Sequence, residues 1–305
     1  MENQDQLKPI IFTDKSGNEF KTIDLDGVPI PAFQEERLGM SRGEHFRKLK
    51  EMTIRDDDVV ICAYPKAGTH WIWEVIQMLR GHTTEYHKHI KEQHMLEVTS
   101  IDSFDAESSP RVLNSHLWPR HLPKQVFEKK TKIIYLIRNP KDTVVSMFFQ
   151  YIAGEKTFGY HGNLSDFIDL YVNKGLPYGQ WYEYVLEWEK FFKTTGNPFY
   201  QLSYEDMQQN RLHHVKGLAK FLETDVSDKL CEDIVDACTL NKMKKANDEV
   251  KEDFVKPYLK EGTSFYRKGK VGDWKNWLTV ADSELIDQMT AKRMKDSQIK
   301  FKYTI

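Results

Sequence analysis

Short apolar runs alternate with amphipathic stretches over most of the chain after residue 55. The runs are rich in β-branched and aromatic residues and have the length of buried strands; they lie at 59–64, 111–117, 132–138 and 199–205. Apolar residues recur at helical spacing twice within 164–194 and also over 71–79, 140–148, 211–222, 228–238 and 281–295. Such alternation indicates parallel strands joined by right-handed crossovers. The sequence therefore predicts an α/β fold, a single domain over 1–305 with a central, mostly parallel sheet flanked by helices.

Two segments stand outside this alternation. Residues 1–55 form a predicted lead-in, with short strand-like pieces between Ile10 and Ile30 and a helix that Ser41 caps. The other segment, 242–266, begins with charged residues that have no periodic apolar face. We expect it to be a mobile surface loop over the site.

Composition and charge limit the class of protein. The 305 residues have a net charge of -2 and are 40% hydrophobic, which is typical of a globular protein and provides no basic field for nucleic acid. No apolar run approaches the roughly 18 residues of a membrane helix, and the first residues contain no signal-peptide core. The cysteines Cys62, Cys231 and Cys238 follow no disulfide or metal-binding spacing. We expect a cytoplasmic protein with neither a membrane nor a nucleic-acid partner.

The loop at 65–69 has the features of a phosphate-binding site. Pro65 ends the preceding strand, Gly68 permits a tight backbone path, and Thr69 is suited to cap the next helix. Backbone N–H groups and the helix dipole would then face an anion, to which Lys66 adds a full charge. The order differs from G-x-x-x-x-G-K-[ST], in which the lysine follows the second glycine and a hydroxyl holds Mg²⁺. An ordinary strand–turn–helix with a solvated lysine is the alternative interpretation.

Two further groups of residues have the chemistry to bind anions. Arg138 lies at the end of a predicted strand and Ser146 lies two turns into the next helix, where ligands gather in open α/β sheets. A Walker B strand would end in aspartate to hold Mg²⁺, so the arginine argues against a metal-nucleotide kinase. The basic stretch 267–275 is either a solvated loop or a third set of phosphate donors, with Gly269 allowing close backbone approach.

Histidines provide weaker signals. His116 stands at the end of a predicted strand, but a lone histidine is more often structural than catalytic. His82, His87, His89 and His94 lie in one polar stretch, which is either a metal site or a solvated loop near a pocket mouth. We favour the loop, because no carboxylate or cysteine completes a familiar ligand spacing. We therefore expect no metal.

Taken together, five motifs resemble those of the cytosolic sulfotransferases. They occur in the family's order over nearly the whole chain, at 64–71, 115–117, 138–142 with Ser146, 204–207 and 267–275. Each motif is weak alone, whereas five in order are specific. The resemblance implies a P-loop-NTPase-like sulfotransferase fold without a metal. It also implies transfer of a sulfonate from 3′-phosphoadenosine 5′-phosphosulfate (PAPS) to a small acceptor, with release of adenosine 3′,5′-bisphosphate (PAP).

The resemblance further implies a role for each motif. The 5′-phosphosulfate would lie against the first loop, formed by Lys66, Ala67, Gly68, Thr69, His70 and Trp71. The 3′-phosphate would lie against Arg138, Ser146, Arg267, Lys268 and Gly269. The adenine would lie near Trp71, Tyr204, Cys238 and Leu240. In the implied catalytic set of His116, Lys66 and Ser146, His116 is the general base and Lys66 stabilises the departing phosphate oxygen.

The chain departs from the family pattern at several positions. The family usually has Lys-Thr-His-Leu where this chain has Asn114 before 115–117, and that lysine contributes to the sulfonate site. His70 stands where a second threonine is common, and Ala67 replaces a usual serine. Near the adenine, Leu240 lacks the aromatic face that the family tends to place there.

The stretch after the last basic motif resembles the family's short dimerisation motif, Lys-x-x-x-Thr-Val-x-x-x-Glu. Its matching residues are Lys275, Thr279, Val280 and Glu284. A small self-complementary contact is expected, because Lys275 and Glu284 could pair across a two-fold axis. We predict a homodimer; a loop leading into the last helix is the alternative interpretation.

Other functions and the identity of the acceptor stay open from the sequence. A degenerate P-loop small-molecule kinase would bind Mg·ATP, and a catalytically weak protein of the same fold would bind PAP or PAPS without turnover. The acceptor could be a phenol, a steroid, another alcohol or an amine. The aromatic residues that could line its pocket, or equally the core, are Phe148, Phe149, Tyr151, Phe158, Tyr160 and Phe265.

Overall fold

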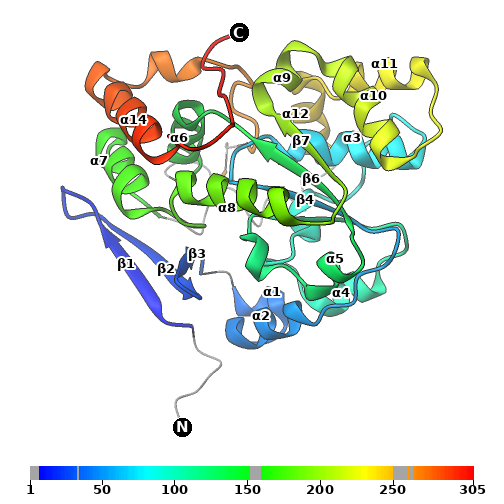
Figure 1. The fold of residues 1–305 in the computed structure, drawn as a ribbon, viewed down its shortest axis with the longest axis horizontal. Helices are drawn as coiled ribbons and strands as arrows, with labels where there is room; N and C mark the ends of the chain where they lie inside the picture. The colour runs from blue at the N-terminus through cyan, green and yellow to red at the C-terminus, as the bar shows by residue number, and fades with distance from the viewer. Residues whose placement is uncertain (1–6, 33, 152–158, 250–259, 262–263) are drawn as a thin grey trace.

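The chain folds around a parallel β-sheet. The computed structural model describes residues 7–32, 34–151, 159–249, 260–261 and 264–305. The four strands, in the order β5-β4-β6-β7, are Val112–Ser115, Val59–Ala63, Lys132–Ile137 and Phe199–Ser203. Every pair is parallel, and helices flank the sheet (Figure 1). The predicted α/β fold with a central parallel sheet is confirmed, and the carboxyl ends of all four strands share one edge.

Side chains alternate along β4 and divide the core between the two faces of the sheet. Val60 and Cys62 pack in a cluster with the aromatic helix α8 (Trp181–Thr194). Val59 and Ile61 belong to the cluster on the other face, with the apolar side of α3 (Thr69–Gly81). All five residues of β4 are buried. This two-sided burial explains why the strand is a continuous apolar run in the sequence.

Helices follow the strands much as the apolar spacing predicts. Asn139 caps α6 (Pro140–Phe149), and its side chain accepts a hydrogen bond from the backbone N–H of Asp142. Helices in the carboxyl-terminal half are α9 (Tyr204–Gln209), α10 (Arg211–Leu222), α11 (Asp228–Ala237), α12 (Leu240–Glu249) and α14 (Val280–Arg293). Shorter helices are α4 (Ile101–Ala106), α5 (Lys124–Glu128) and α7 (Leu164–Asp169).

The predicted lead-in forms a small second sheet and two helices. Its antiparallel strands are β1 (Pro9–Thr13), β2 (Glu19–Leu25) and β3 (Val28–Ile30). They are followed by α1 (Glu35–Leu38) and α2 (Arg42–Lys50). As predicted, the Ser41 hydroxyl accepts a hydrogen bond from the backbone N–H of Glu44. Phe20 and Ile23 of β2 share a hydrophobic cluster with β4, so the lead-in is part of the core.

Several local predictions are wrong. The N-cap of α3 is Gly68 rather than Thr69, with a φ of 102° that favours glycine. The last predicted strand ends at Ser203, whose side chain caps α9. Residues 242–249 are helical, not a loop, because they continue α12. Of the remaining predicted loop, 250–259 and 262–263 lie outside the described residues.

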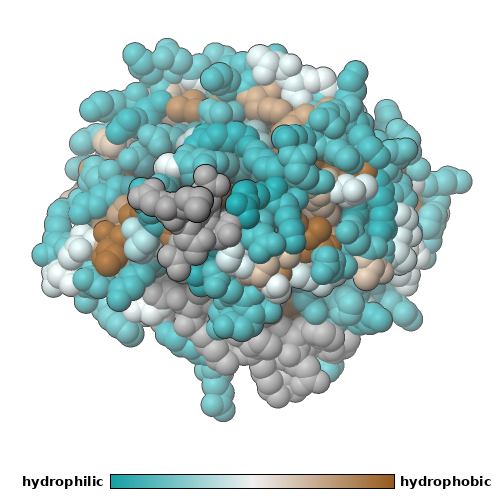
Figure 2. Space-filling view, turned by 90° about the horizontal axis from the view of Figure 1, so that it is seen from below, coloured by the Kyte–Doolittle hydropathy of each residue, from teal (hydrophilic) through white to brown (hydrophobic). Residues whose placement is uncertain are grey.

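The surface is mainly hydrophilic. Figure 2 shows one face on which apolar patches are small and separate. Among the described residues, the large apolar side chains that are exposed are Ile11, Phe199, Trp277, Val280 and Ile305. Within the same described ranges, the helices are all too short or too polar to cross a membrane.

Candidate active site

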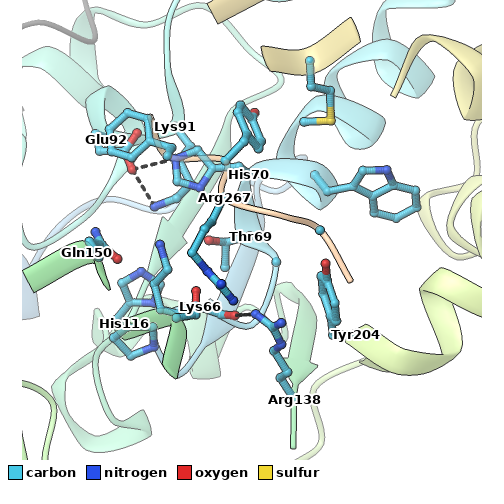
Figure 3. Close-up of a pocket in the computed structure, with 18 of the residues that line it drawn as sticks. Lys66, Thr69, His70, Lys91, Glu92, His116, Arg138, Gln150, Tyr204 and Arg267 are labelled. Carbon is cyan, nitrogen blue, oxygen red and sulfur yellow. Dashed lines mark hydrogen bonds and ion pairs between the residues drawn. The ribbon is translucent and has the colours of Figure 1, made fainter. Parts of the chain in front are cut away.

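A pocket collects the residues that follow the four parallel strands. Lys66, His116, Arg138 and Tyr204 come just after β4, β5, β6 and β7, and all four line it. Figure 3 shows His116 on one side of Lys66 and Tyr204 on the other, with Arg138 and Arg267 between. Parallel strands end at one edge, so residues distant in the sequence converge there. The other predicted residues that line the pocket are Gly68, Thr69, His70, Trp71, Ser146, Cys238, Leu240, Arg267, Lys268 and Gly269.

The loop between β4 and α3 has a backbone shape that glycine makes possible. Both Lys66, with a φ of 71°, and Gly68, with a φ of 102°, lie in the left-handed region. A Cβ on Gly68 would lie 2.8 Å from Cδ2 of Tyr204, so a larger residue would clash. Since α3 begins at Thr69, its first N–H groups and the positive end of its dipole face the loop. Ala67, unlike its neighbours in the loop, is buried in the core and does not line the pocket.

Arg138 is held beside the pocket by two contacts. Its Nη1 donates a 3.0 Å hydrogen bond to the carbonyl oxygen of Lys66. Its guanidinium lies 4.1 Å from the centroid of the Tyr204 ring. The Nε atom is buried and has no hydrogen-bond partner among the described residues. A buried donor without a partner costs about 1–3 kcal/mol of stability. An anion that accepted a hydrogen bond from this Nε would remove that cost, so the position favours anion binding.

A second cationic group comes from the loop after the undescribed stretch. Arg267 Nη1 and Lys268 Nζ lie 2.5 and 3.0 Å from the carboxylate oxygens of Asp273. Burial acts to raise the pKa of Asp273, but hydrogen bonds from its neighbours outweigh burial and hold the pKa well below its usual range. Gly269 has a φ of 62°, and a Cβ there would lie 3.0 Å from Leu240. The glycine thus lets this basic loop pack against α12 at the pocket.

His116 presents a neutral ring to the pocket. Its Nδ1 lies 2.7 Å from the carbonyl oxygen of Ala63, which can only accept, so Nδ1 carries the proton and Nε2 the lone pair. Burial, reinforced by the nearby charge of Lys91, lowers the pKa of His116 to about 3. The Glu97 carboxylate accepts hydrogen bonds from the His116 backbone N–H (2.8 Å) and the Ser115 hydroxyl (2.9 Å). The hydrogen bond to Ala63 fixes the tautomer of His116, and the contacts of Glu97 fix its backbone. Nε2 is therefore positioned to accept a proton.

Stability is expected to fall as the pH is lowered from about 7 to about 5. Burial lowers the pKa of His70 to about 4 and the pKa values of His116 and His121 to about 3. The unfolded rings bind protons near pH 6.5 while the folded rings remain neutral, so the unfolded state gains protons first. Each ring can remove up to about 1.4 kcal/mol per pH unit. Urea unfolding at several pH values checks this slope. His121→Leu should flatten it, and an unchanged slope in that variant would contradict the explanation.

Lys91 and Glu92 also line the pocket, although neither is predicted from the sequence. They lie on the 3₁₀ turn Lys91–His94. Glu92 Oε1 is 3.0 Å from both Lys91 Nζ and His70 Nε2 (Figure 3). Burial acts to raise the pKa of Glu92, but His70 and Lys91 lower it further than burial raises it. The turn is held by Asn114, whose Nδ2 donates 2.9 Å hydrogen bonds to the carbonyls of Lys91 and His94.

The prediction of a solvated loop for the histidine-rich stretch holds for residues 82–89, which form no helix or strand and are exposed or half-buried, but it is wrong for His94. His94 is buried, and potential ligand atoms of His87, His89 and His94 lie within 4.8 Å of one another. A carboxylate does reach this group, since Glu107 contacts His94. His82 is exposed and is not a member of the group.

Of the aromatic residues that the sequence suggests for the acceptor pocket, some line the pocket and others pack in the core. Tyr151 and Phe265 line the pocket, and so does Tyr178. Phe148 and Phe149 pack against the core, while Tyr160 is buried and donates a hydrogen bond to Asp14. Phe158 lies outside the described residues. Burial does not separate the two groups, because Tyr151 and Phe265 are buried and still line the pocket, whereas Phe148 and Phe149 are half-buried.

Comparison with known proteins decides the family. A family model for the sulfotransferase domain matches residues 56–298. The chain belongs to the sulfotransferase family. Sulfotransferase 1E1 of Bos taurus is 33% identical over 282 residues, covering 86% of this chain and 92% of that protein. The Homo sapiens protein of the same name is 32% identical over 285 residues, with the same coverage.

Solved structures agree with this assignment. The crystal structure of mouse sulfotransferase SULT7A1 complexed with PAP matches with a TM-score of 0.71 and 28% identity, over 90% of this sulfotransferase and 96% of that chain. Retinol dehydratase, solved with androsterone and inactive cofactor PAP, has a TM-score of 0.75 at 16% identity over 93% and 92% of the chains, and supports the fold. The expected sulfotransferase family and fold are confirmed.

Proposed function

We propose that this sulfotransferase takes its sulfonate from PAPS and transfers it to the hydroxyl or amine of a small acceptor. The observation that supports this most is the convergence of separate cationic groups on one pocket: Lys66 in its loop, Arg138, and the pair Arg267 and Lys268. PAPS carries anionic groups at both its 5′ and 3′ positions, and separate donor clusters suit them. The PAP complex of the mouse relative supports the same donor.

The proposed donor lies across the edge of the sheet. The 5′-phosphosulfate meets the loop from Lys66 to Trp71 and the amino end of α3. The 3′-phosphate meets Arg138, Ser146 and residues 267–269. Trp71 Nε1 donates a 2.9 Å hydrogen bond to the carbonyl of Cys238, which fixes the indole at the part of the pocket assigned to adenine. Tyr204 and Leu240 complete that part.

The proposed transfer is an in-line displacement. His116 Nε2 accepts the proton of the acceptor as its oxygen or nitrogen bonds to sulfur, and the bond from sulfur to the 5′-phosphate oxygen breaks. Lys66 and the N–H groups of α3 stabilise the charge that grows on this departing oxygen. No divalent metal takes part in this step, because the lysine, the helix dipole and Arg138 balance the charge. PAP and the sulfated acceptor are the products.

Lys91 is proposed to supply the second positive charge that the family pattern places at position 114, where this chain has Asn114. Its ammonium group is buried at the pocket wall, 3.0 Å from Glu92 and close enough to His116 to lower that residue's pKa. Asn114 instead holds the backbone of the turn that carries Lys91. The positive charge would therefore come from the connection between β4 and β5, rather than from β5 itself, where the usual family pattern places it.

The Lys91→Met variant is expected to lower kcat about 10- to 100-fold, the range for losing a hydrogen bond to a charged group, with a smaller change in PAP affinity. Initial rates and PAP titration measure the two effects. Lys88→Met, at an exposed position of the same stretch, is the matched control. Lys91→Met combined with Glu92→Gln separates loss of the cation from an unpaired carboxylate. Full turnover in both Lys91 variants would rule out this role.

The part of the pocket proposed to bind the acceptor is lined by aliphatic and aromatic side chains. Met95, Val98, Tyr151, Tyr178 and Phe265 provide apolar and aromatic surface. The Tyr178 ring lies 5.3 Å from the His116 ring, so this surface adjoins the proposed base. We propose a small acceptor that is largely apolar and has one nucleophilic hydroxyl or amine, such as a phenol or an alcohol.

A homodimer through the motif near the last helix is also proposed. Lys275, Val280 and Glu284 are exposed, and 76% of Val280 is accessible, which is unusual for an apolar side chain. Thr279 caps α14 by accepting a hydrogen bond from the Asp282 N–H, so it fixes the position of its neighbours. Sedimentation of wild type and Val280→Glu tests this contact; a monomer for wild type would exclude it.

Thermal unfolding with and without ligand tests the proposed donor. PAP at about 100 times its dissociation constant stabilises the folded state by roughly 2.7 kcal/mol. We expect a clear rise in the melting temperature with PAP and little change with Mg·ATP. A rise only with Mg·ATP would favour a degenerate P-loop kinase, and no rise with PAP would remove the proposed function. Binding of PAP without turnover of any acceptor would leave the weakly active alternative.

A further inference from the structure

We propose that His87, His89 and His94 form a Zn²⁺ site beside the pocket, separate from the sulfonate-transfer machinery. The three residues lie in the connection between α3 and α4, and their potential ligand atoms are all within 4.8 Å of one another. Imidazole nitrogen is a preferred ligand of Zn²⁺. Nothing in the proposed transfer reaction uses these side chains.

The strongest evidence is the ring of His94. Its Nδ1 lies 3.1 and 3.2 Å from the two carboxylate oxygens of Glu107 and donates its proton to that carboxylate. The opposite nitrogen, Nε2, is buried and has no hydrogen-bond partner among the described residues. The side chain as a whole is about nineteen-twentieths buried, with 5% exposed. A carboxylate on one nitrogen and an unused lone pair on the other is the arrangement of metal-ligating histidines.

The other two rings adjoin this lone pair. Ring centroids of His87 and His89 lie 5.6 and 5.9 Å from that of His94. Both are partly exposed, and His87 packs edge-on against the ring of Trp73, 5.0 Å away. His94 is held by Glu107 and by the same Trp73 ring, 5.3 Å away. Ligand nitrogens in a tetrahedral zinc site lie about 3.3 Å apart, given Zn–N distances near 2.0–2.1 Å. Small rotations of the His87 and His89 rings would close the site around the ion.

Aromatic packing alone does not account for this cluster. His87 Nδ1 accepts a 3.2 Å hydrogen bond from the His89 backbone N–H, a long contact that a metal would replace or re-orient. Packing gives no reason for a buried nitrogen without a partner, nor for a carboxylate on the far side of the same ring. With three protein ligands the fourth position would be left to water or a small anion.

The site is also tied to the pocket wall. Asn114 donates one hydrogen bond to the carbonyl of His94 and one to the carbonyl of Lys91, both 2.9 Å long. The turn that carries the buried ligand therefore also carries Lys91 and Glu92. The proposed ion lies behind that turn, outside the donor and acceptor regions, so its binding can be tested without substrate.

The test uses the full chain without a polyhistidine tag, stripped with a chelator. Calorimetric titration with ZnCl₂ is expected to show one strongly bound ion, and Co²⁺ is expected to give the visible absorption of a low-coordinate site. His87→Ala and His89→Ala should each weaken binding at least about tenfold, and Glu107→Gln about 10- to 100-fold. His82→Asn, in the same stretch but outside the group, is the matched control and should bind as wild type. Unchanged melting temperatures without metal will show that the variants fold.

Two results would overturn the proposal. One is the absence of one-to-one Zn²⁺ binding by the stripped wild-type protein. The other is equal affinity in His87→Ala, His89→Ala and His82→Asn, which would place the ion elsewhere. Neither result depends on PAP binding or on turnover, so either one would leave the proposed sulfonate transfer unaffected.

Discussion

The His116→Ala variant is expected to lose about 10²–10⁴-fold in kcat while it still binds PAP. The lone pair of His116 Nε2 faces the pocket, because Nδ1 donates its proton to the Ala63 carbonyl. Without this ring, no group described at the same position can take the acceptor's proton. PAP does not require the base, so nucleotide affinity should change little. Initial rates with PAPS and a titration with PAP measure the two effects.

Two controls make the His116 result specific. His116→Gln fills more of the space left by the ring and separates loss of the base from loss of packing. His213→Ala removes an exposed histidine on α10 and should have no effect on turnover. Wild-type kcat in His116→Ala would exclude His116 as the base. Loss of PAP binding equal to the loss of kcat would indicate that the residue is structural.

The Lys66→Met variant is expected to lose about 10²–10³-fold in kcat, the usual cost of removing one donor to developing charge. Lys66 is in the loop where β4 turns into α3, and its backbone is held there because Arg138 bonds to its carbonyl. Its charge matters more as the 5′-phosphate oxygen departs than in the bound donor, so kcat should fall more than PAP affinity. Single-turnover rates and PAP titration separate these effects.

Lys268→Met is the matched control for Lys66→Met. Lys268 is assigned to the 3′-phosphate and lies in the opposite cationic group, paired with Asp273. Its loss should weaken PAP binding and leave the single-turnover rate nearly unchanged at saturating PAPS. If Lys66→Met instead behaves as Lys268→Met is expected to, with affinity reduced and the saturated rate intact, the role in the departing charge is wrong.

The sheet and the residues at its carboxyl edge could be predicted because their signals are local and mutually consistent. β4 is a fully apolar run, β6 is apolar after its first residue, Lys132, and each is followed by a proline and a helix cap. Once the strands are parallel, Lys66, His116 and Arg138 must converge on one edge. The resemblance to the family then related separate motifs to one proposed donor; the family is confirmed, whereas the role of each residue stays a prediction.

Residues that depend on a turn's three-dimensional path could not be predicted. Lys91, Glu92 and His94 have the composition of a surface loop, yet all are buried because Asn114 ties the turn to β5. The helical state of 242–249 could not be predicted either, since its charged sequence has few apolar positions and the packing of its helix against the basic loop depends on Gly269 and Leu240. Such contacts join segments far apart in sequence, so no local pattern reveals them.

Sulfonate transfer itself is the measurement that tests the central claim most directly. The purified chain is incubated with ³⁵S-labelled PAPS and a panel of phenols, steroid alcohols and amines, and labelled products are separated and counted. The account predicts label in at least one hydroxyl or amine acceptor, dependent on PAPS and lost in His116→Ala. PAP binding with no labelled product from any acceptor would contradict it and leave a nucleotide-binding protein that has lost its reaction.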